Sequence, residues 1–189
     1  MDAGTLLILT GPPGAGKTTV GALVASESPL SACVHSDWFW TTIVNGHIPP
    51  WERAADDQNR AVIRAAAAAG VRMANAGYTV VLDGILGPWH FEPLSEELAH
   101  CTAPVHYAVL RPDSDTCLAR ARGRVLESLE HRNALTDEGP IRQMWEQFHH
   151  LGPLEQFVID SSDLDPLATA GLVLERLGAG DLNFSATDP

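Results

Sequence analysis

The chain has 189 residues, of which 45% are hydrophobic and 19% charged, and its formal net charge is -12 at pH 7. This length suits a single globular domain, and the composition excludes a disordered or fibrous chain. The negative charge repels phosphate backbones and so disfavours general binding to nucleic acids. No apolar run approaches the roughly 18 residues of a membrane span, and the N-terminus lacks the basic flank of a signal peptide. We therefore expect a cytoplasmic protein without a membrane partner.

Short apolar runs alternate with helical segments along the chain. The predicted strands cover residues 5–10, 32–36, 79–83, 105–110 and 156–160. The predicted helices cover residues 17–27, 52–76, a short stretch after Pro93, 113–130, 138–150 and 166–177. Strands that alternate with helices pair in parallel through right-handed crossovers, which predicts an α/β three-layer sandwich. We expect one domain over residues 1–178 and a flexible C-terminal tail over 179–189, which is rich in Gly, Ser and Asp.

The segment after the first strand carries a phosphate-binding pattern. Residues 11–18 read GPPGAGKT, which fits G-x-x-x-x-G-K-[ST] between a strand and a helix. Glycines allow a tight turn that points backbone N–H groups at a phosphate, and the helix N-terminus adds its positive dipole. The predicted nucleotide-binding residues are Gly11, Pro12, Pro13, Gly14, Ala15, Gly16, Lys17, Thr18 and Thr19.

Two residues of this loop have more specific expected roles. Lys17, the only lysine of the chain, is expected to act in catalysis by bridging the β- and γ-phosphates of a nucleotide. The Thr18 hydroxyl is expected to bind Mg²⁺. A GTPase base motif N-K-x-D is impossible because no second lysine exists. A mechanical ATPase usually carries Asp-Glu at a strand end where this chain has Asp83-Gly84, so the pattern favours a kinase that uses ATP and Mg²⁺.

Two carboxylates follow predicted strands, at the edge where parallel sheets bind ligands. We expect Asp37 to accept or orient the proton of an acceptor hydroxyl, and a helix N-cap is the alternative interpretation. Asp83 is expected either to belong to the Mg²⁺ shell or to bind the acceptor. Four of the five tryptophans fall on the same side, namely Trp38, Trp40, Trp51 and Trp89. Trp38 and Trp89 are the candidates for an acceptor pocket, with burial in the core as the alternative. The loop 41–52 is a candidate substrate flap.

Arginines gather in one segment, because six of the eleven lie between residues 111 and 142. We predict an arginine-rich lid over about 120–140, whose cations close over the phosphates. Arg120 and Arg124 are four residues apart and are the predicted catalytic cations, while Arg132 is a further candidate on the substrate side. The alternative is a solvated helix face whose arginines pair with Glu127 and Glu130.

Several of these motifs together resemble the small P-loop kinases. They are GPPGAGKT at 11–18, the strand-end Asp37, VVLDG at 80–84, LRP at 110–112, the arginine segment and VIDSS at 158–162. The chain is most similar in style to the chloramphenicol phosphotransferase-like group, with gluconate kinase, shikimate kinase and zeta-toxin kinases as wider relatives. The insertion at 40–51 and the segment 131–148 depart from that group.

The resemblance implies a five-stranded parallel sheet in the order 2-3-1-4-5, with Asp37 as the base and residues 160–165 beside the adenine. It also implies an enzyme that transfers the γ-phosphate of Mg-ATP to a hydroxyl. We therefore expect an ATP-dependent small-molecule O-phosphotransferase with an alcohol group as acceptor, and antibiotics and sugar-like metabolites are the acceptor classes considered. A zeta-toxin-like nucleotide-sugar kinase and a non-catalytic nucleotide-binding switch are the alternatives. A homo-oligomer is compatible with the sequence.

Overall fold

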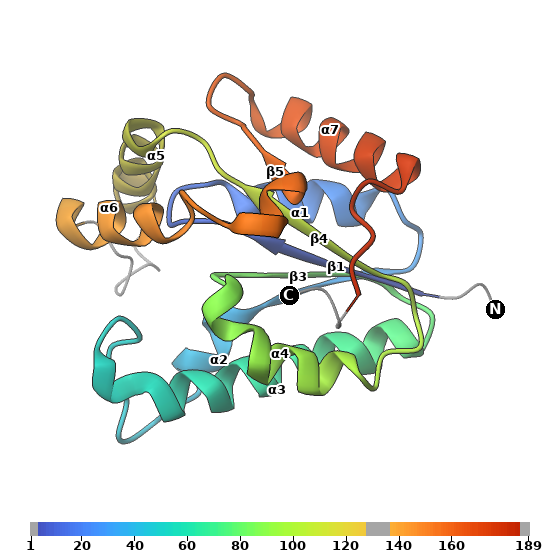
Figure 1. Ribbon diagram of the computed structural model, residues 1–189, viewed down its shortest axis with the longest axis horizontal. Helices are drawn as coiled ribbons and strands as arrows, with labels where there is room; N and C mark the ends of the chain where they lie inside the picture. Colours follow the sequence, from blue (N-terminus) through green and yellow to red (C-terminus); the bar gives the residue numbers. More distant parts are fainter. Residues whose placement is uncertain (1–3, 128–136, 186–189) are drawn as a thin grey trace.

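The most apolar run of the chain forms the centre of the sheet. Residues 6–9 of β1 (Thr5–Thr10) are at most 1% exposed, as expected for a strand that is covered on both faces. The computed structural model describes residues 4–127 and 137–185 (Figure 1), and the side chains from residue 124 to 127 are not described. The predictions that fall on residues 128–136 therefore lie outside the described part of the chain.

Five parallel strands make one sheet. They are β1 (Thr5–Thr10), β2 (Ser31–His35), β3 (Thr79–Gly84), β4 (Val105–Leu110) and β5 (Val158–Ile159). Their order is β2-β3-β1-β4-β5, and every pair of neighbours is parallel. The predicted fold class and strand order are therefore confirmed. All five carboxyl ends lie at one edge of the sheet, on the left in Figure 1.

Helices cover both faces of this sheet (Figure 1). On one face lie α2 (Ser36–Thr41), α3 (Asp56–Asn75) and α4 (Phe91–Leu98), and on the other lie α1 (Lys17–Ser26), α5 (Ser114–Glu127), α6 (Glu138–Gln147) and α7 (Pro166–Ala179). Three short 3-10 helices complete the order, namely η1 (Arg53–Ala55), η2 (Pro88–His90) and η3 (Gly152–Phe157). Buried residues of α3 recur every three to four positions, which explains why this helix packs flat on the sheet. No helix in the described residues is long and apolar enough to cross a bilayer.

Two predicted boundaries differ from the structure. The strand predicted at 156–160 is reduced to β5, because Gln156 and Phe157 belong to η3. The strand predicted at 32–36 ends at His35, and Ser36 already opens α2. Sheet edges and strand ends are weakly specified by hydrophobic pattern alone, because only one neighbour constrains them. The second difference moves Asp37 into the first turn of a helix.

The C-terminal segment packs against the sheet instead of extending freely. The Tyr107 N–H donates to the carbonyl oxygen of Leu182 over 2.9 Å, and Leu182 is fully buried. The Phe184 ring stacks on Tyr107 with their centroids 5.1 Å apart. Residues 180–184, which fall within the predicted tail, therefore pack on the sheet through the apolar side chains of Leu182 and Phe184. Residues 186–189 lie outside the described part.

Candidate active site

The predicted phosphate loop turns tightly between β1 and α1. Gly11, Gly14 and Gly16 have φ angles of 146°, 81° and 92°, which side chains rarely adopt. A Cβ atom on Gly11 would lie 2.1 Å from the carbonyl oxygen of Leu110 in β4. A Cβ atom on Gly14 would lie 2.0 Å from the carbonyl oxygen of Cys117 in α5. The loop therefore rests directly on the backbone of two other elements, and only glycine fits at these contacts.

The loop also holds the single lysine. The Nζ atom of Lys17 donates to the carbonyl oxygens of Gly11 and Pro12, each over 2.9 Å. Thr18 and Thr19 are exposed in the first turn of α1, whose N-cap is Gly16. A helix N-terminus, a glycine cradle and an ammonium group together suit a phosphate, and a hydroxyl oxygen suits Mg²⁺. The residues present therefore fit a Mg-nucleotide.

The Cys117 thiol lies beneath this loop and is fully buried. Burial raises the pKa of Cys117 to about 11, and the opposing effect of the Lys17 charge is smaller. The thiol is therefore protonated at neutral pH and serves packing rather than nucleophilic chemistry.

Asp83 is buried at the carboxyl end of β3, where its Oδ1 atom lies 2.8 Å from Nδ1 of His35. His35 ends the neighbouring strand β2 and is the register partner of Asp83. Its ring also packs edge-on against Trp38, with the two centroids 4.4 Å apart. Burial, and to a lesser extent the charge of Asp83, raises the pKa of the nearby Cys33 thiol. Both interpretations of Asp83, in the Mg²⁺ shell or at the acceptor, remain predictions.

Asp37 lies two residues after the end of β2, in the first turn of α2, and its side chain is exposed. The N-cap position of α2 is His35, so the alternative that Asp37 caps this helix is wrong. No described residue makes a hydrogen bond or ion pair with the Asp37 carboxylate. Ser36 beside it is fully buried, and a Cβ atom on Gly84 would lie 2.0 Å from its Oγ atom. The start of α2 therefore packs against the end of β3. This contact places Asp37 at the carboxyl edge of the sheet, where the phosphate loop follows β1.

Trp89 lies in η2, just beyond β3, and is exposed. Its ring covers Gly87, where an added Cβ atom would lie 2.4 Å from the indole. It also packs edge-on against Phe148, which follows α6, with the centroids 5.0 Å apart. Trp38 is exposed as well, so the expectation that these two residues are ordinary core is wrong for both.

The predicted flap, residues 41–52, is tied to the start of α3 by two amide side chains. Gln58 accepts from the backbone N–H of Ile48 over 2.8 Å and donates to its carbonyl oxygen over 2.7 Å. Asn59 is buried, accepts from the Trp40 indole over 3.0 Å and donates to the carbonyl oxygen of Pro50 over 2.7 Å. Sequence reasoning missed both amides, because a polar residue at the start of a helix is ordinarily solvated.

The predicted lid arginines have different surroundings. Arg120 Nη2 donates to the carbonyl oxygens of Ser161 and Leu164 over 3.0 and 3.2 Å, in the segment that follows β5. Contact with a phosphate would require Arg120 to leave these carbonyl groups, so its catalytic role stays a prediction. The side chain of Arg124 and all of Arg132 lie outside the described residues.

Other arginines of the cluster join elements to one another. Arg142 in α6 pairs with Asp115 of α5 over 2.8 Å and with Glu138 over 2.9 Å. Arg111 forms a two-pronged pair with Glu155, each N–O distance being 2.9 Å. The Arg142–Asp115 pair joins α6 to α5, and the Arg111–Glu155 pair joins the end of β4 to η3.

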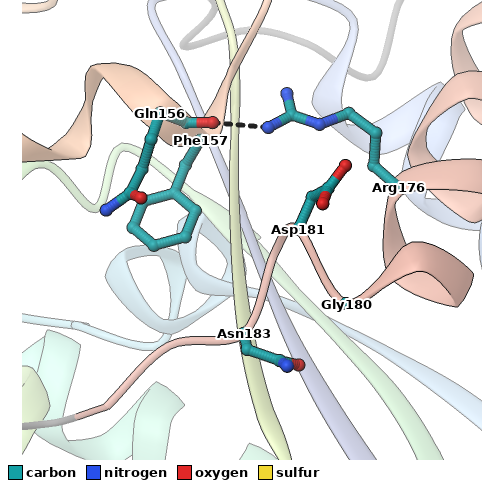
Figure 2. Close-up of a pocket in the computed structure, with 6 residues that line it drawn as sticks. All are labelled: Gln156, Phe157, Arg176, Gly180, Asp181 and Asn183. Atoms are coloured by element: carbon teal, nitrogen blue, oxygen red, sulfur yellow. Dashed lines mark hydrogen bonds between the residues drawn. The ribbon is translucent and has the colours of Figure 1, made fainter.

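A separate polar pocket of about 480 Å³ lies at the opposite end of the sheet (Figure 2). It is lined by Gln156, Phe157, Arg176, Gly180, Asp181 and Asn183. The Arg176 guanidinium donates to the carbonyl oxygens of Gln156 and Val158, so these bonds anchor the end of α7 to β5. The pocket includes none of the predicted site residues.

The parallel sheet in the order β2-β3-β1-β4-β5, with helices on both faces and the glycine loop of residues 11–18 after β1, is a P-loop kinase fold. The family model AAA_33, an AAA domain, matches residues 6–151. That match covers more than half of the chain, so the chain belongs to this family of P-loop proteins.

Solved structures of kinases and a resistance protein share the fold. The tunicamycin resistance protein of Deinococcus radiodurans superposes with a TM-score of 0.63 at 19% identity, covering 93% of this chain and 96% of that one. Shikimate kinase of Bacteroides thetaiotaomicron gives 0.63 at 18% identity, covering 92% and 98%. The APS kinase CysC of Mycobacterium tuberculosis, solved with AMPPNP and APS, gives 0.61 at 17% identity, covering 93% and 98%. The curated proteins contain no match to this chain.

Proposed function

We propose that this chain is an ATP-dependent O-phosphotransferase that moves the γ-phosphate of Mg-ATP to a hydroxyl group of a small acceptor. The proposal rests on the exposed Asp37 carboxylate, which lies at the same edge of the sheet as the phosphate loop. Only β3 lies between β2, which leads to Asp37, and β1, which leads to the loop. A base and a phosphate cradle at one edge are what transfer to an alcohol requires.

The proposed reaction forms a bond between the acceptor hydroxyl oxygen and the γ-phosphorus, while the bond from that phosphorus to the β–γ bridging oxygen breaks. ADP leaves, and the hydroxyl proton passes to the Asp37 carboxylate and then to water. Lys17 and the backbone N–H groups of the loop hold the phosphates and balance their charge. Thr18 and Asp83 are the proposed Mg²⁺ residues, and the bound ion would neutralise charge on the β- and γ-phosphates. Arg120 and Arg124 are the proposed lid cations, and Arg132 is a further candidate on the substrate side.

The test is transfer of labelled phosphate from Mg-ATP to a panel of alcohols. The panel holds antibiotics, because one similar fold is that of a tunicamycin resistance protein. It also holds nucleosides, sugar acids and nucleotide sugars, which would reveal a zeta-toxin-like kinase. Asp37→Asn should lower transfer by about 10² or more while nucleotide affinity stays nearly unchanged.

The matched control is Asp181→Asn, which removes an exposed carboxylate at the opposite end of the sheet. It should transfer phosphate at the rate of the unmodified chain. Transfer by Asp37→Asn at that same rate would exclude Asp37 as the base. Nucleotide binding without transfer to any acceptor would favour a nucleotide-binding switch.

A further inference from the structure

Exposed apolar side chains are unevenly distributed over the molecule. Among the described residues, six large hydrophobic side chains are exposed, and four of them lie between residues 38 and 89. Three of these four are tryptophans: Trp38 is 63% exposed, Trp51 53% and Trp89 41%. All three lie in segments that follow β2 or β3. These two strands end at the same edge of the sheet as β1, which leads into the phosphate loop. An apolar surface gathered beside a reaction site is typical of a ligand-binding surface.

Two of the indoles are held in place despite their exposure. Trp38 packs edge-on against the His35 ring at an interplanar angle of 60°, and His35 is itself held by Asp83. Trp89 packs edge-on against the fully buried Phe148 at 77° and lies over Gly87. A side chain supported on one face keeps its other surface available in a defined position. Rigid aromatic surfaces bind flat rings at little cost in conformational entropy.

The segments that carry Trp38 and Trp51 are mostly acidic, which disfavours an anionic acceptor. Between residues 36 and 59 the chain carries four carboxylates and one arginine. These charged residues are Asp37, Glu52, Arg53, Asp56 and Asp57. The next two arginines on α3 are already paired, Arg60 with Glu92 and Arg64 with Glu96. His90 adds no positive charge at neutral pH, because burial lowers its pKa to about 4.

We propose that the acceptor is an alcohol with a flat apolar ring and no negative charge, bound against Trp38 and Trp89. This inference rests on the proposed phosphotransferase function and adds the chemical class of its acceptor. Asp37 and Trp38 are both exposed in the first turn of α2, at the same edge of the sheet as the phosphate loop. A highly polar acceptor or an anionic one would gain little from these surfaces.

The experiment uses two probes that differ in one group. Para-methylbenzyl alcohol carries a ring and a primary hydroxyl, and para-(hydroxymethyl)benzoate replaces its methyl group by a carboxylate. Binding of each probe to the full chain is measured by saturation-transfer NMR in the presence of Mg-AMPPNP. Fragments of this size bind weakly, so the titration extends to the order of 10 mM. We expect the neutral probe to bind and the carboxylate to bind at least several-fold more weakly.

Variants then locate the binding surface. Trp38→Ala and Trp89→Ala should each weaken the neutral probe by about twofold to tenfold, and Trp38→Phe should retain part of the affinity because it keeps a ring. Leu30→Ala is the matched control, because Leu30 is also exposed but precedes β2 at the opposite edge of the sheet. Its affinity should be unchanged.

Three results would overturn the inference. They are equal affinity for both probes, equal affinity in the two alanine variants and the unmodified chain, and no binding of either probe while Mg-AMPPNP binds. In the last case the phosphotransferase proposal survives, because nucleotide binding is read separately. Failure to bind Mg-AMPPNP would reject the phosphotransferase proposal itself and the acceptor class with it.

Discussion

His35 and Asp83 occupy paired positions at the ends of neighbouring parallel strands, and their Nδ1 and Oδ1 atoms lie 2.8 Å apart. Their side chains are only 14% and 7% exposed, so the carboxylate has exchanged water for the imidazole. A buried carboxylate needs such a partner, because an unpaired one retains most of its desolvation cost. The His35 ring also packs against Trp38, so the pair connects the ends of β2 and β3 to α2.

The first prediction concerns this pair. His35→Phe keeps a ring against Trp38 but removes the hydrogen bond to Asp83, and it should lower the free energy of unfolding by about 1–3 kcal/mol. Adding Asp83→Asn to that variant should recover part of the loss, because the amide carries no charge. Urea unfolding of the four proteins in this cycle measures the coupling. Strictly additive losses would show that the two side chains do not stabilise each other.

Gly84 is predicted to be poorly replaceable, because the end of β3 lies directly against the start of α2 there. In Gly84→Ala the new Cβ atom would lie 2.0 Å from Oγ and 3.0 Å from Cβ of Ser36, both in the first turn of α2. The variant should lose about 1–3 kcal/mol of unfolding free energy through overpacking and should displace Asp37, which lowers phosphate transfer.

Two further variants control for this effect. Ser36→Ala in the Gly84→Ala background removes the closer of the two clashing atoms and should recover part of the stability. Gly171→Ala in α7 meets no atom within 4 Å, and it should stabilise the chain by about 0.4–1 kcal/mol because alanine favours the helix. A fully stable Gly84→Ala protein would show that α2 shifts without cost.

The single lysine permits a direct test of the phosphate loop. An amine-acylating reagent can modify only Lys17 and the N-terminal amine. Saturating Mg-ATP should slow acylation of Lys17 and leave that of the N-terminus unchanged, as read by peptide mass spectrometry. Lys17→Ala should weaken nucleotide binding by about 10- to 100-fold, because a charged hydrogen-bond donor is lost. Equal acylation with and without Mg-ATP would remove Lys17 from the phosphate site.

The last prediction is a loss of stability in mild acid. Burial lowers the pKa of His90 to about 4, although the charge of Asp56 opposes this shift, and the ordinary value is 6.5. Between these two values the unfolded chain binds more protons, so the free energy of unfolding should fall as the pH drops from 6.5 towards 4. The contribution is at most about 3 kcal/mol. Burial also lowers the pKa of His106, which adds in the same direction.

His90→Gln tests this prediction, since glutamine does not titrate. Urea unfolding across the acid range should show a shallower pH dependence for His90→Gln than for the unmodified chain. His100→Gln is the control, because His100 is exposed and lies at the end of α4. If both variants keep the slope of the unmodified chain, His90 is not the group responsible.

Local patterns predicted the centre of the fold well. Four consecutive apolar residues between Thr5 and Thr10 form the middle of β1, and Gly11, Gly14 and Gly16, which follow it, have positive φ angles. Where the apolar pattern was short or interrupted, the predicted bounds differed from those in the structure. The edge strand β5 is only two residues long, and the chain after α7 is anchored through Leu182 and Phe184, whose apolar side chains stand among glycines and polar residues.

The order of residues alone sufficed to predict the conformation of the phosphate loop, because its turns depend on glycines that lie within six residues of Lys17 in the chain. Three contacts join residues far apart in the chain. His35 pairs with Asp83, 48 positions away, Trp40 donates to Asn59, 19 positions away, and Arg120 donates to Ser161, 41 positions away. Such contacts depend on strand register and packing between layers, which no local pattern encodes. Only the folded chain therefore decided which polar groups are buried together and which tryptophans stay exposed beside the site.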